Sequence, residues 1–378
     1  MEEAFSYFNL CTVCGTCRAD CTIYKIKKLE SLSPRSRIIL AGLLAQNRID
    51  ISPRVIEAYF TCTLCDMCHN KCPSGVDVPK IVKIIRNYLI QNKKAPKPIT
   101  DLLNVIKNSK NIFNIDNEDR LAWTEEIEEI INDKINKSAK IAFYIGCQGS
   151  FKGSIFPMPV SMVKILNKLK IDFTILGEEE WCCGNPIALT GNLGDDFIQF
   201  AKHNIDKMNE LGVEKILFTC PGCYRTWKFI YPQALKIKKL PFELIHSTEF
   251  IDDLIKQGKL NIENKYSKRI GYQDPCELGR MSGIFDPPRN ILKSIPDIQF
   301  IELEDSRMNS ACCGGGGLCK VTYNFLSEEI AKYKINMFKN SNVETIITSC
   351  PACFDNLSSV IDDNIEIKDI HELILDLL

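Results

Sequence analysis

Short apolar runs and amphipathic stretches alternate along the C-terminal two-thirds of the chain. The apolar runs cover 140–146, 172–176 and 215–219, and then 269–273, 298–303 and 345–348. Between them, apolar residues recur at helical spacing in 159–170, 195–211 and 327–338. Strands that alternate with helices are typical of a parallel sheet with helical crossovers. The pattern therefore predicts two small α/β units, at 140–260 and 261–378.

The N-terminal part of the chain has a different pattern. Residues 34–44 follow Ser33 with apolar residues at helical spacing and a proline in the first turn. Residues 78–90 form a second amphipathic stretch. We therefore expect a mostly helical domain at 1–95.

A stretch rich in Lys, Asn, Asp and Glu separates these parts at 96–139. We expect it to be a connector that wraps across the first α/β unit, with a helical stretch near Trp123. Phe113 and Trp123 would anchor it by packing, because large aromatic side chains are more often buried than used for binding.

Charge and hydropathy exclude some classes of protein. Lys and Arg number 47 against 48 Asp and Glu, which gives no basic surface for nucleic acid. The chain lacks an apolar run of the roughly 20 residues that span a bilayer, and its first residues lack the features of a signal peptide. We expect a cytoplasmic protein with no transmembrane segment of its own, or one held at a membrane by a partner.

The 19 cysteines point to metal or redox chemistry, because the cytosol keeps thiols reduced. Two runs share the spacing Cys-x2-Cys-x2-Cys-x3-Cys, which is that of a ferredoxin with two [4Fe-4S] clusters. The fourth cysteine of each such run ligates the other run's cluster. The expected ligand sets are Cys11, Cys14 and Cys17 with Cys72, and Cys62, Cys65 and Cys68 with Cys21.

Zinc is the alternative metal for these runs, but zinc sites usually pair two Cys-x2-Cys knuckles. Arg35, Arg37, Lys71 and His69 lie near the runs in sequence. Since each set of four is complete without it, His69 is expected to be a partly exposed helix residue and not a ligand.

A duplication carries five further cysteines in each copy. Four of the five recur at one offset, as 312 − 182 = 130 shows for the first cysteine of each Cys-Cys-Gly motif. All ten follow predicted strands, so each set should meet at one edge of its sheet. Gly314–Gly317 would let the backbone approach a bulky ligand closely. The two sets are Cys147, Cys182, Cys183, Cys220 and Cys223, and Cys276, Cys312, Cys313, Cys350 and Cys353.

Cys319 has no counterpart in the first copy, and we expect it to be a buried thiol. The copies also differ around their first cysteine: 146–149 reads Gly-Cys-Gln-Gly, whereas 274–277 reads Asp-Pro-Cys-Glu. The two sites are therefore predicted not to be equivalent.

These motifs together resemble a known family. Paired ferredoxin runs followed by two Cys-Cys-Gly motifs are similar to the iron-sulfur subunits typified by the D subunit of heterodisulfide reductase, over nearly the whole chain. Ser33-Pro34-Arg35 and 120–123 also resemble the iron-sulfur subunits of flavin-dependent glycolate, lactate and glycerol-3-phosphate dehydrogenases. The resemblance implies a multidomain fold: an α-helical ferredoxin domain followed by two duplicated α/β CCG domains with small parallel sheets.

The resemblance also implies cofactors and function. Each five-cysteine set would hold a noncubane [4Fe-4S] cluster, and these clusters would be the catalytic centres that split a disulfide between them. The candidate catalytic residues are the cysteines of the second set. The two ferredoxin clusters would relay electrons to these clusters, which cleave a disulfide; Arg225, Arg280 and Arg289 would bind anionic groups of the substrate. The alternative is an electron-transfer subunit of a flavin-dependent 2-hydroxy acid or glycerol-3-phosphate dehydrogenase.

Either function needs an electron partner: a flavoprotein, a ferredoxin or a membrane cytochrome. The chain has no glycine-rich nucleotide fingerprint after a strand, so flavin or nicotinamide would come from that partner.

Overall fold

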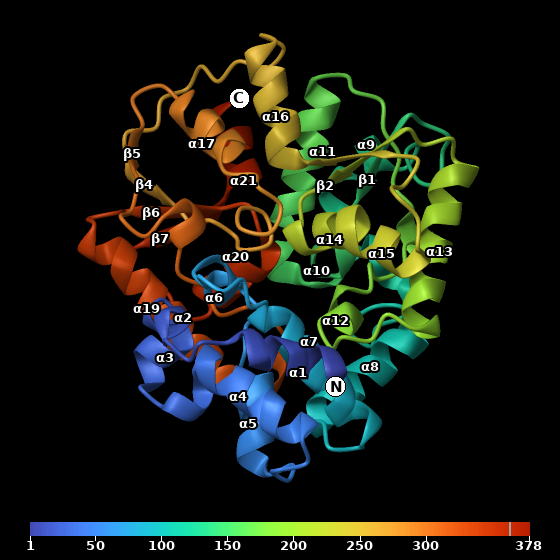
Figure 1. The fold of residues 1–378 in the computed structure, drawn as a ribbon. Helices are drawn as coiled ribbons and strands as arrows, with labels where there is room; N and C mark the ends of the chain where they lie inside the picture. Colours follow the sequence, from blue (N-terminus) through green and yellow to red (C-terminus); the bar gives the residue numbers. More distant parts are fainter. Residues whose placement is uncertain (363) are drawn as a thin grey trace.

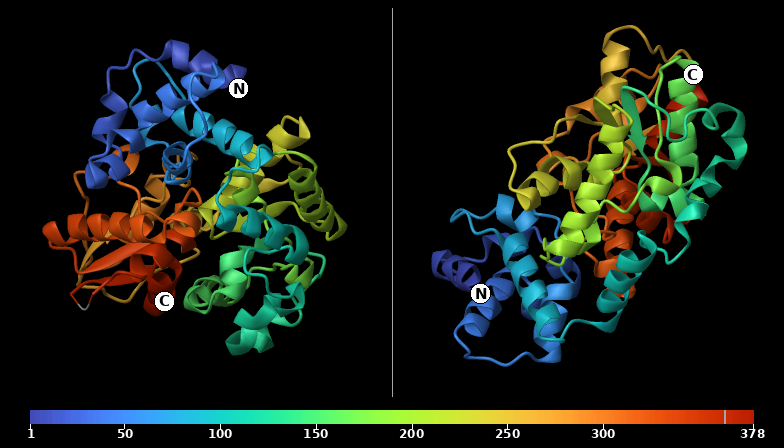
Figure 2. Two further views of the ribbon diagram at one scale, coloured as in Figure 1. Left: turned by 90° about the horizontal axis from the view of Figure 1, so that it is seen from below. Right: turned by 90° about the vertical axis from the view of Figure 1, so that its right-hand side faces the viewer.

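The computed structural model describes residues 1–362 and 364–378. A helical N-terminal segment lies against two α/β halves that sit side by side (Figure 1). Figure 2 shows the same three parts from two further directions. No helix in the described residues is long and apolar enough to cross a membrane.

The N-terminal segment is helical, as predicted. Ser33 and Asp77 cap its two main helices: Ser33 Oγ accepts from the Ser36 amide at 3.1 Å, and Asp77 Oδ1 accepts from the Lys80 amide at 2.8 Å. These two helices pack against each other. The helices of the segment are α1 (Glu2–Leu10), α2 (Thr16–Ala19), α3 (Thr22–Lys27), α4 (Pro34–Ala45), α5 (Pro53–Phe60), α6 (Met67–Asn70) and α7 (Val78–Gln91).

Residues 96–139 contain more helix than the sequence suggested. Helix α8 (Lys97–Ser109) buries Ile99 and Ile106, a 3₁₀ stretch covers Asn117–Ile127, and α9 (Glu128–Ile131) follows. Trp123 is buried in the core of the first half, which agrees with the packing role expected for it.

The first half contains a three-stranded parallel sheet in the order β1-β2-β3. Strands β1 (Ile141–Tyr144) and β2 (Lys215–Phe218) are the predicted ones. Strand β3 (Glu243–His246) was not predicted, because this edge strand carries polar residues at both ends. The helices of this half are α10 (Gly146–Phe151), α11 (Pro157–Lys168), α12 (Asn185–Ala188), α13 (Asp195–Glu210), α14 (Pro221–Arg225), α15 (Tyr231–Leu235) and α16 (Ser247–Lys256).

The strand expected at 172–176 is reduced to isolated bridges. Thr174 pairs with β1, donating to Ile141 O at 2.9 Å, whereas Ile175 pairs on its other side with Ile135. The segment divides its hydrogen bonds between the sheet and the connector, so no continuous strand forms.

The second half contains a four-stranded parallel sheet in the order β5-β4-β6-β7. Its strands are β4 (Arg269–Tyr272), β5 (Gln299–Ile301), β6 (Thr345–Thr348) and β7 (Glu366–Asp369). Strand β7, like β3, is a polar edge strand that the apolar pattern missed. The helices are α17 (Asp286–Lys293), α18 (Cys319–Thr322), α19 (Asn324–Asn340), α20 (Pro351–Ser358) and α21 (Ile370–Leu377).

The two halves meet along paired helices, with α11 packed on α21 and α16 on α17. A buried polar chain crosses this interface. His371 lies 2.7 Å from Ser247 Oγ through Nε2 and 2.6 Å from Asp369 Oδ1 through Nδ1. Although the three side chains resemble a catalytic triad, all are fully buried, so they join the halves and are closed to a substrate.

Candidate metal centres

The four cysteines of each ferredoxin run separate in space. Cys11, Cys14, Cys17 and Cys72 line one cavity together with Gly15 and Arg35. Cys21 lies instead among the second run, where burial raises its pKa to about 11 and the charges of Cys65 and Cys62 add to the effect. The fold therefore brings the fourth cysteine of each run to the first three of the other run.

The backbone of both runs has the same unusual conformation. Val13 and Leu64 have φ of 58° and 52°, and Gly15 and Asp66 have φ of 83° and 66°. Positive φ is strained for a β-branched residue such as Val13 and clusters at functional sites. In each run the chain thus turns sharply between its first and third cysteines, which lets all three side chains face one point.

Cationic side chains flank the second run. Arg37 is buried, and its Nε donates to Ala58 O at 2.6 Å. Burial opposes its charge, but Cys62 and Cys21 hold the pKa of Arg37 above its ordinary value. His69 is partly exposed and lies 3.2 Å from Asp66, which agrees with the expectation for this residue.

The first five-cysteine set lines a single cavity. Gly146, with φ of 76°, lies so close that a Cβ there would be 3.0 Å from Cys223 Sγ. Hydrogen bonds from Cys182 and then Cys223 lower the pKa of Cys183 to about 6. Because metal ligation requires the thiolate, this converging set of thiols suits a metal cluster.

The second set is also brought together. Cys353 Sγ lies 3.0 Å from Cys313 Sγ, and hydrogen bonds from Cys312 and Cys353 hold the pKa of Cys313 well below its ordinary value. Hydrogen bonding with Cys276 and with Cys65 lowers the pKa of Cys312. A cysteine of the second ferredoxin run thus touches the second set directly.

The glycines of 314–317 explain this proximity. A Cβ at Gly317 would lie 2.3 Å from the Thr63 carbonyl carbon, and one at Gly315 would lie 2.5 Å from Ala352 O. These glycines therefore pack against the backbone of neighbouring segments. Gly316 and Gly317 also line a pocket beside Cys276, so the expectation that the run leaves room for a ligand stays a prediction.

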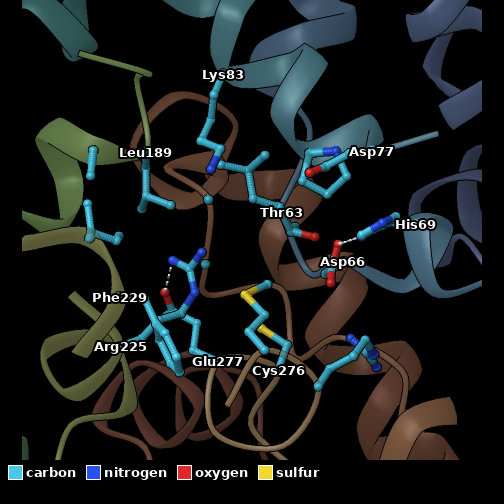
Figure 3. A pocket seen from close by; sticks show the side chains of 18 residues that line it. Thr63, Asp66, His69, Asp77, Lys83, Leu189, Arg225, Phe229, Cys276 and Glu277 are labelled. Carbon is cyan, nitrogen blue, oxygen red and sulfur yellow. Dashed lines mark hydrogen bonds and ion pairs between the residues drawn. The ribbon is translucent and has the colours of Figure 1, made fainter. Parts of the chain in front are cut away.

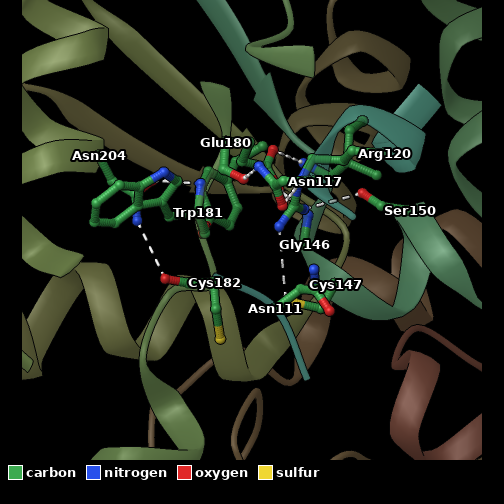
Figure 4. A network of polar contacts seen from close by, with 12 residues as sticks. Asn111, Asn117, Arg120, Gly146, Cys147, Ser150, Glu180, Trp181, Cys182 and Asn204 are labelled. Carbon is green, nitrogen blue, oxygen red and sulfur yellow. Dashed lines mark hydrogen bonds and ion pairs between the residues drawn. The ribbon is translucent and has the colours of Figure 1, made fainter. Parts of the chain in front are cut away.

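A buried ion pair lies beside the first set (Figure 4). Arg120 Nη1 donates to Glu180 Oε1 at 2.8 Å, and Arg120 Nη2 lies 3.9 Å from Cys147 Sγ. Glu180 also accepts from the amides of Ile145 and Gly146 at 2.9 and 2.8 Å. Although burial opposes it, Glu180 and Cys147 hold the pKa of Arg120 above its ordinary value.

A pocket of about 300 Å³ opens where the N-terminal segment meets both halves. Figure 3 shows Cys276 on its wall, with Lys83 and Arg225 pointing toward each other across it. Arg225 lies 3.9 Å from Glu277, and burial together with Arg225 lowers the pKa of Lys83. A second cleft of about 580 Å³ shares Lys83 and Arg225 and leads outward.

The three arginines proposed from the sequence have different positions. Arg225 and Arg280 both line the pocket. Arg280, however, donates to the backbone carbonyls of Met308, Cys65 and Ser310. Arg289 is fully buried, where it pairs with Asp274 at 2.8 Å and Glu302 at 2.6 Å. Arg289 therefore has no donor left for a substrate, which corrects the expectation.

Lys83 is a pocket residue that sequence reasoning missed. It belongs to the amphipathic pattern of α7 and is distant in sequence from every cysteine of the second set. Cys319 is fully buried and close to Arg86 and Cys312, which agrees with its expected role as a buried thiol.

Comparison with known proteins supports this arrangement. Residues 141–228 and 270–358 match a cysteine-rich domain, CCG, and residues 7–76 match a 4Fe-4S dicluster domain. The chain is 32% identical to the D subunit of dihydromethanophenazine:CoB–CoM heterodisulfide reductase from Methanosarcina acetivorans, over 96% of this chain and 92% of that protein. The corresponding protein of Methanosarcina barkeri is also 32% identical, over 98% and 94%.

A second kind of relative is EtfAB:quinone oxidoreductase of Syntrophomonas wolfei. It is 30% identical over 79% of this chain but over only 42% of its own length. The near-complete matches with the heterodisulfide reductase proteins therefore define the relationship. This chain belongs to the family typified by the D subunit of heterodisulfide reductase, and it is an iron-sulfur oxidoreductase.

Proposed function

We propose that the chain is the disulfide-cleaving component of a multisubunit reductase. The observation that carries this proposal is the pocket in which Cys276 faces Lys83 and Arg225. It adjoins the second five-cysteine set and lies beside the second ferredoxin run. A substrate there would reach the cysteine set from outside while electrons reach it from within.

Four ligand sets follow from the grouping of the thiols. The crossed ferredoxin sets would each hold a cubane [4Fe-4S] cluster, and each five-cysteine set would hold a noncubane one. When bound, such clusters supply electrons one at a time. Converging thiols line a cavity at the first ferredoxin site and at the first five-cysteine set, and at the second five-cysteine set Cys313 and Cys353 lie 3.0 Å apart.

The overall reaction is R–S–S–R′ with two electrons and two protons to give RSH and R′SH. A partner of the flavoprotein, ferredoxin or cytochrome class would supply the electrons. The Asp66–His69 pair lines the pocket, and burial raises the pKa of Asp66. An ionisable carboxyl group therefore lies in the same pocket as Cys276.

The crossed ligand sets can be tested by replacing Cys72 with alanine. We expect the spectroscopic signal of the Cys11–Cys14–Cys17 cluster to be lost, because Cys72 lies at that cavity. Replacing Cys21 should instead affect the cluster of the second run. Electron paramagnetic resonance (EPR) of the reduced, anaerobically purified variants makes the comparison. Damage confined to the Cys62 cluster in the Cys72 variant would mean that the ligand sets are not crossed.

Replacing Arg225 with glutamine tests whether Arg225 binds an anionic group of the substrate. We expect KM for a disulfide that carries a carboxylate, sulfonate or phosphate to rise by about tenfold or more, since hydrogen bonds between charged groups contribute about 1.5–3 kcal/mol. KM for a neutral disulfide should change little. Lys107→Gln is the matched control, because Lys107 is an exposed cation outside the pocket lining. Equal effects on charged and neutral disulfides would contradict anion binding by Arg225.

The carrier function is the second candidate, because EtfAB:quinone oxidoreductase is among the relatives. A carrier should be reduced rapidly by a flavoprotein supplied with its substrate and should not release thiols from any disulfide. Anaerobic assay of thiol release with dithionite as reductant separates the two functions.

A further inference from the structure

The duplication allows the surroundings of the two five-cysteine sets to be compared position by position. The amide of Gly184 donates to Cys182 Sγ at 3.4 Å, and the amide of Gly314 donates to Cys312 Sγ at 3.3 Å. Both glycines have positive φ, 79° and 90°. The local structure therefore repeats at the 130-residue offset. Residues at equivalent positions can be compared directly, and a change of residue there shows how the two sites differ.

Two residues near the first site, Glu180 and Asn204, differ in charge from the residues 130 positions later. Glu180 neutralises Arg120 in the buried pair beside Cys147. Asn204 is buried and neutral; its Oδ1 accepts from the Trp181 amide at 3.1 Å and its Nδ2 donates to Cys182 O at 3.3 Å. The buried side chains at these positions therefore add no net charge to the first site.

At the second site the same positions hold Ser310 and Lys334 (310 − 180 = 130; 334 − 204 = 130). Lys334, on α19, is 1% exposed and its Nζ lies 3.3 Å from Ser310 Oγ. The duplicated carboxylate is replaced by a hydroxyl, and the neutral amide by an ammonium. These two positions are thus more positively charged at the second site than at the first.

A cluster of charges lies beside Lys334, in which Arg289 pairs with both Asp274 and Glu302. Asp274 interacts with Lys334 but already receives both Nη atoms of Arg289, at 2.8 and 2.9 Å. Asp305 contributes more weakly, followed by Cys313 and Cys353. Burial lowers the pKa of Lys334 to about 8, so the ammonium is still mostly protonated at neutral pH.

We propose that Lys334 is a positioning residue that raises the reduction potential of the second five-cysteine site. A cluster gains negative charge on reduction, and a cation in a buried, low-dielectric position stabilises the reduced form. The second site is also the one that Cys65 of the ferredoxin runs touches. A higher potential there favours the arrival of electrons at the site whose cysteine lines the pocket. The inference rests on the proposed occupancy of the second set by a cluster.

The test is a redox titration of the full chain, monitored by EPR, with Lys334→Gln. The signal of the second site is the one lost in the Cys312→Ser, Cys313→Ser variant. We expect Lys334→Gln to shift this signal to lower potential, with unchanged iron content, and to leave the first-site signal in place. Lys332→Gln is the control, because Lys332 lies two residues away on the same helix but is exposed. Lys334→Arg should retain the potential.

A second variant covers the case in which Lys334→Gln loses its cluster. Ser310→Asp keeps the ammonium but restores a carboxylate at the duplicated position of Glu180, so it should also lower the potential. An unchanged second-site potential in either iron-replete variant would overturn the inference. Loss of the cluster from both variants would also overturn it, because Lys334 would then be needed only for folding. Absence of any iron at the second set in the unaltered protein would refute the proposed occupancy instead.

Discussion

Replacing Cys312 and Cys313 with serine should remove about four of the roughly sixteen irons that four [4Fe-4S] clusters would contain. It should also abolish thiol release from disulfides. Both thiols are buried and lie in contact with other cysteines of the second set or with Cys65. Their loss removes two of the five proposed ligands of the second set. Iron analysis and an anaerobic disulfide assay measure the two effects.

Cys319→Ser is the matched control for this variant. Cys319 is fully buried and near Cys312, but it has no counterpart in the duplication and is not among the proposed ligands. Its iron content should stay at the full value. A double variant that keeps all its iron would show that the second set holds no cluster, and equal losses in both variants would point to a general folding defect.

The Cys312→Ser, Cys313→Ser variant also helps to distinguish a disulfide reductase from an electron carrier. A reductase must let substrate sulfur reach the second site, so thiols added to the oxidised protein should produce a new paramagnetic signal that the double variant lacks. Spectra that do not respond to a broad panel of thiols and disulfides would support the carrier function.

Replacing Arg120 with leucine should destabilise the protein by about 3–5 kcal/mol, because it leaves Glu180 as a buried charge without its partner. Arg120 and Glu180 side chains are 2% and 1% exposed, so water cannot compensate for the loss. The variant should also lose iron from the first five-cysteine set, since Arg120 borders Cys147. Urea unfolding monitored by circular dichroism, with iron analysis of the folded protein, measures both effects.

Lys207→Met is the control for the loss of a cation. Lys207 pairs with Glu179 at 3.3 Å and with Glu210 at 3.2 Å on the surface, where an ion pair contributes about 0–1 kcal/mol. If Arg120→Leu lowers the free energy of unfolding no more than the control does, the buried ion pair does not stabilise the fold.

Much of this protein could be predicted from the sequence, because its cysteine motifs are defined by the spacing of nearby residues. The Cys-x2-Cys-x2-Cys-x3-Cys runs and the strands β1, β2, β4 and β6 are recognisable from neighbours within a few residues, and the duplication from motifs that repeat along the chain. Caps such as Ser33 likewise act within one helical turn. The fold class and the family follow from these features, and the comparisons confirm both.

Features that depend on which distant segments pair with each other could not be predicted in this way. Strands β3 and β7 have no apolar run, because each forms a sheet edge where half of the backbone and many side chains meet solvent. The segment at 172–176 is apolar enough for a strand, but Thr174 pairs with Ala142 whereas Ile175 pairs with Ile135, so no continuous strand forms.

The roles of charged residues were the least predictable. Arg225 and Arg289 are both arginines near cysteine motifs in sequence, yet one lines the pocket and the other is held by Asp274 and Glu302. Lys83 and Lys334 looked like ordinary helix residues. The sequence by itself determined how the thiols are grouped into motifs, because motif spacing is a local property. Only the tertiary structure decided which charges face those thiols, because a charge acts through space and its effect depends on burial and on partners far along the chain.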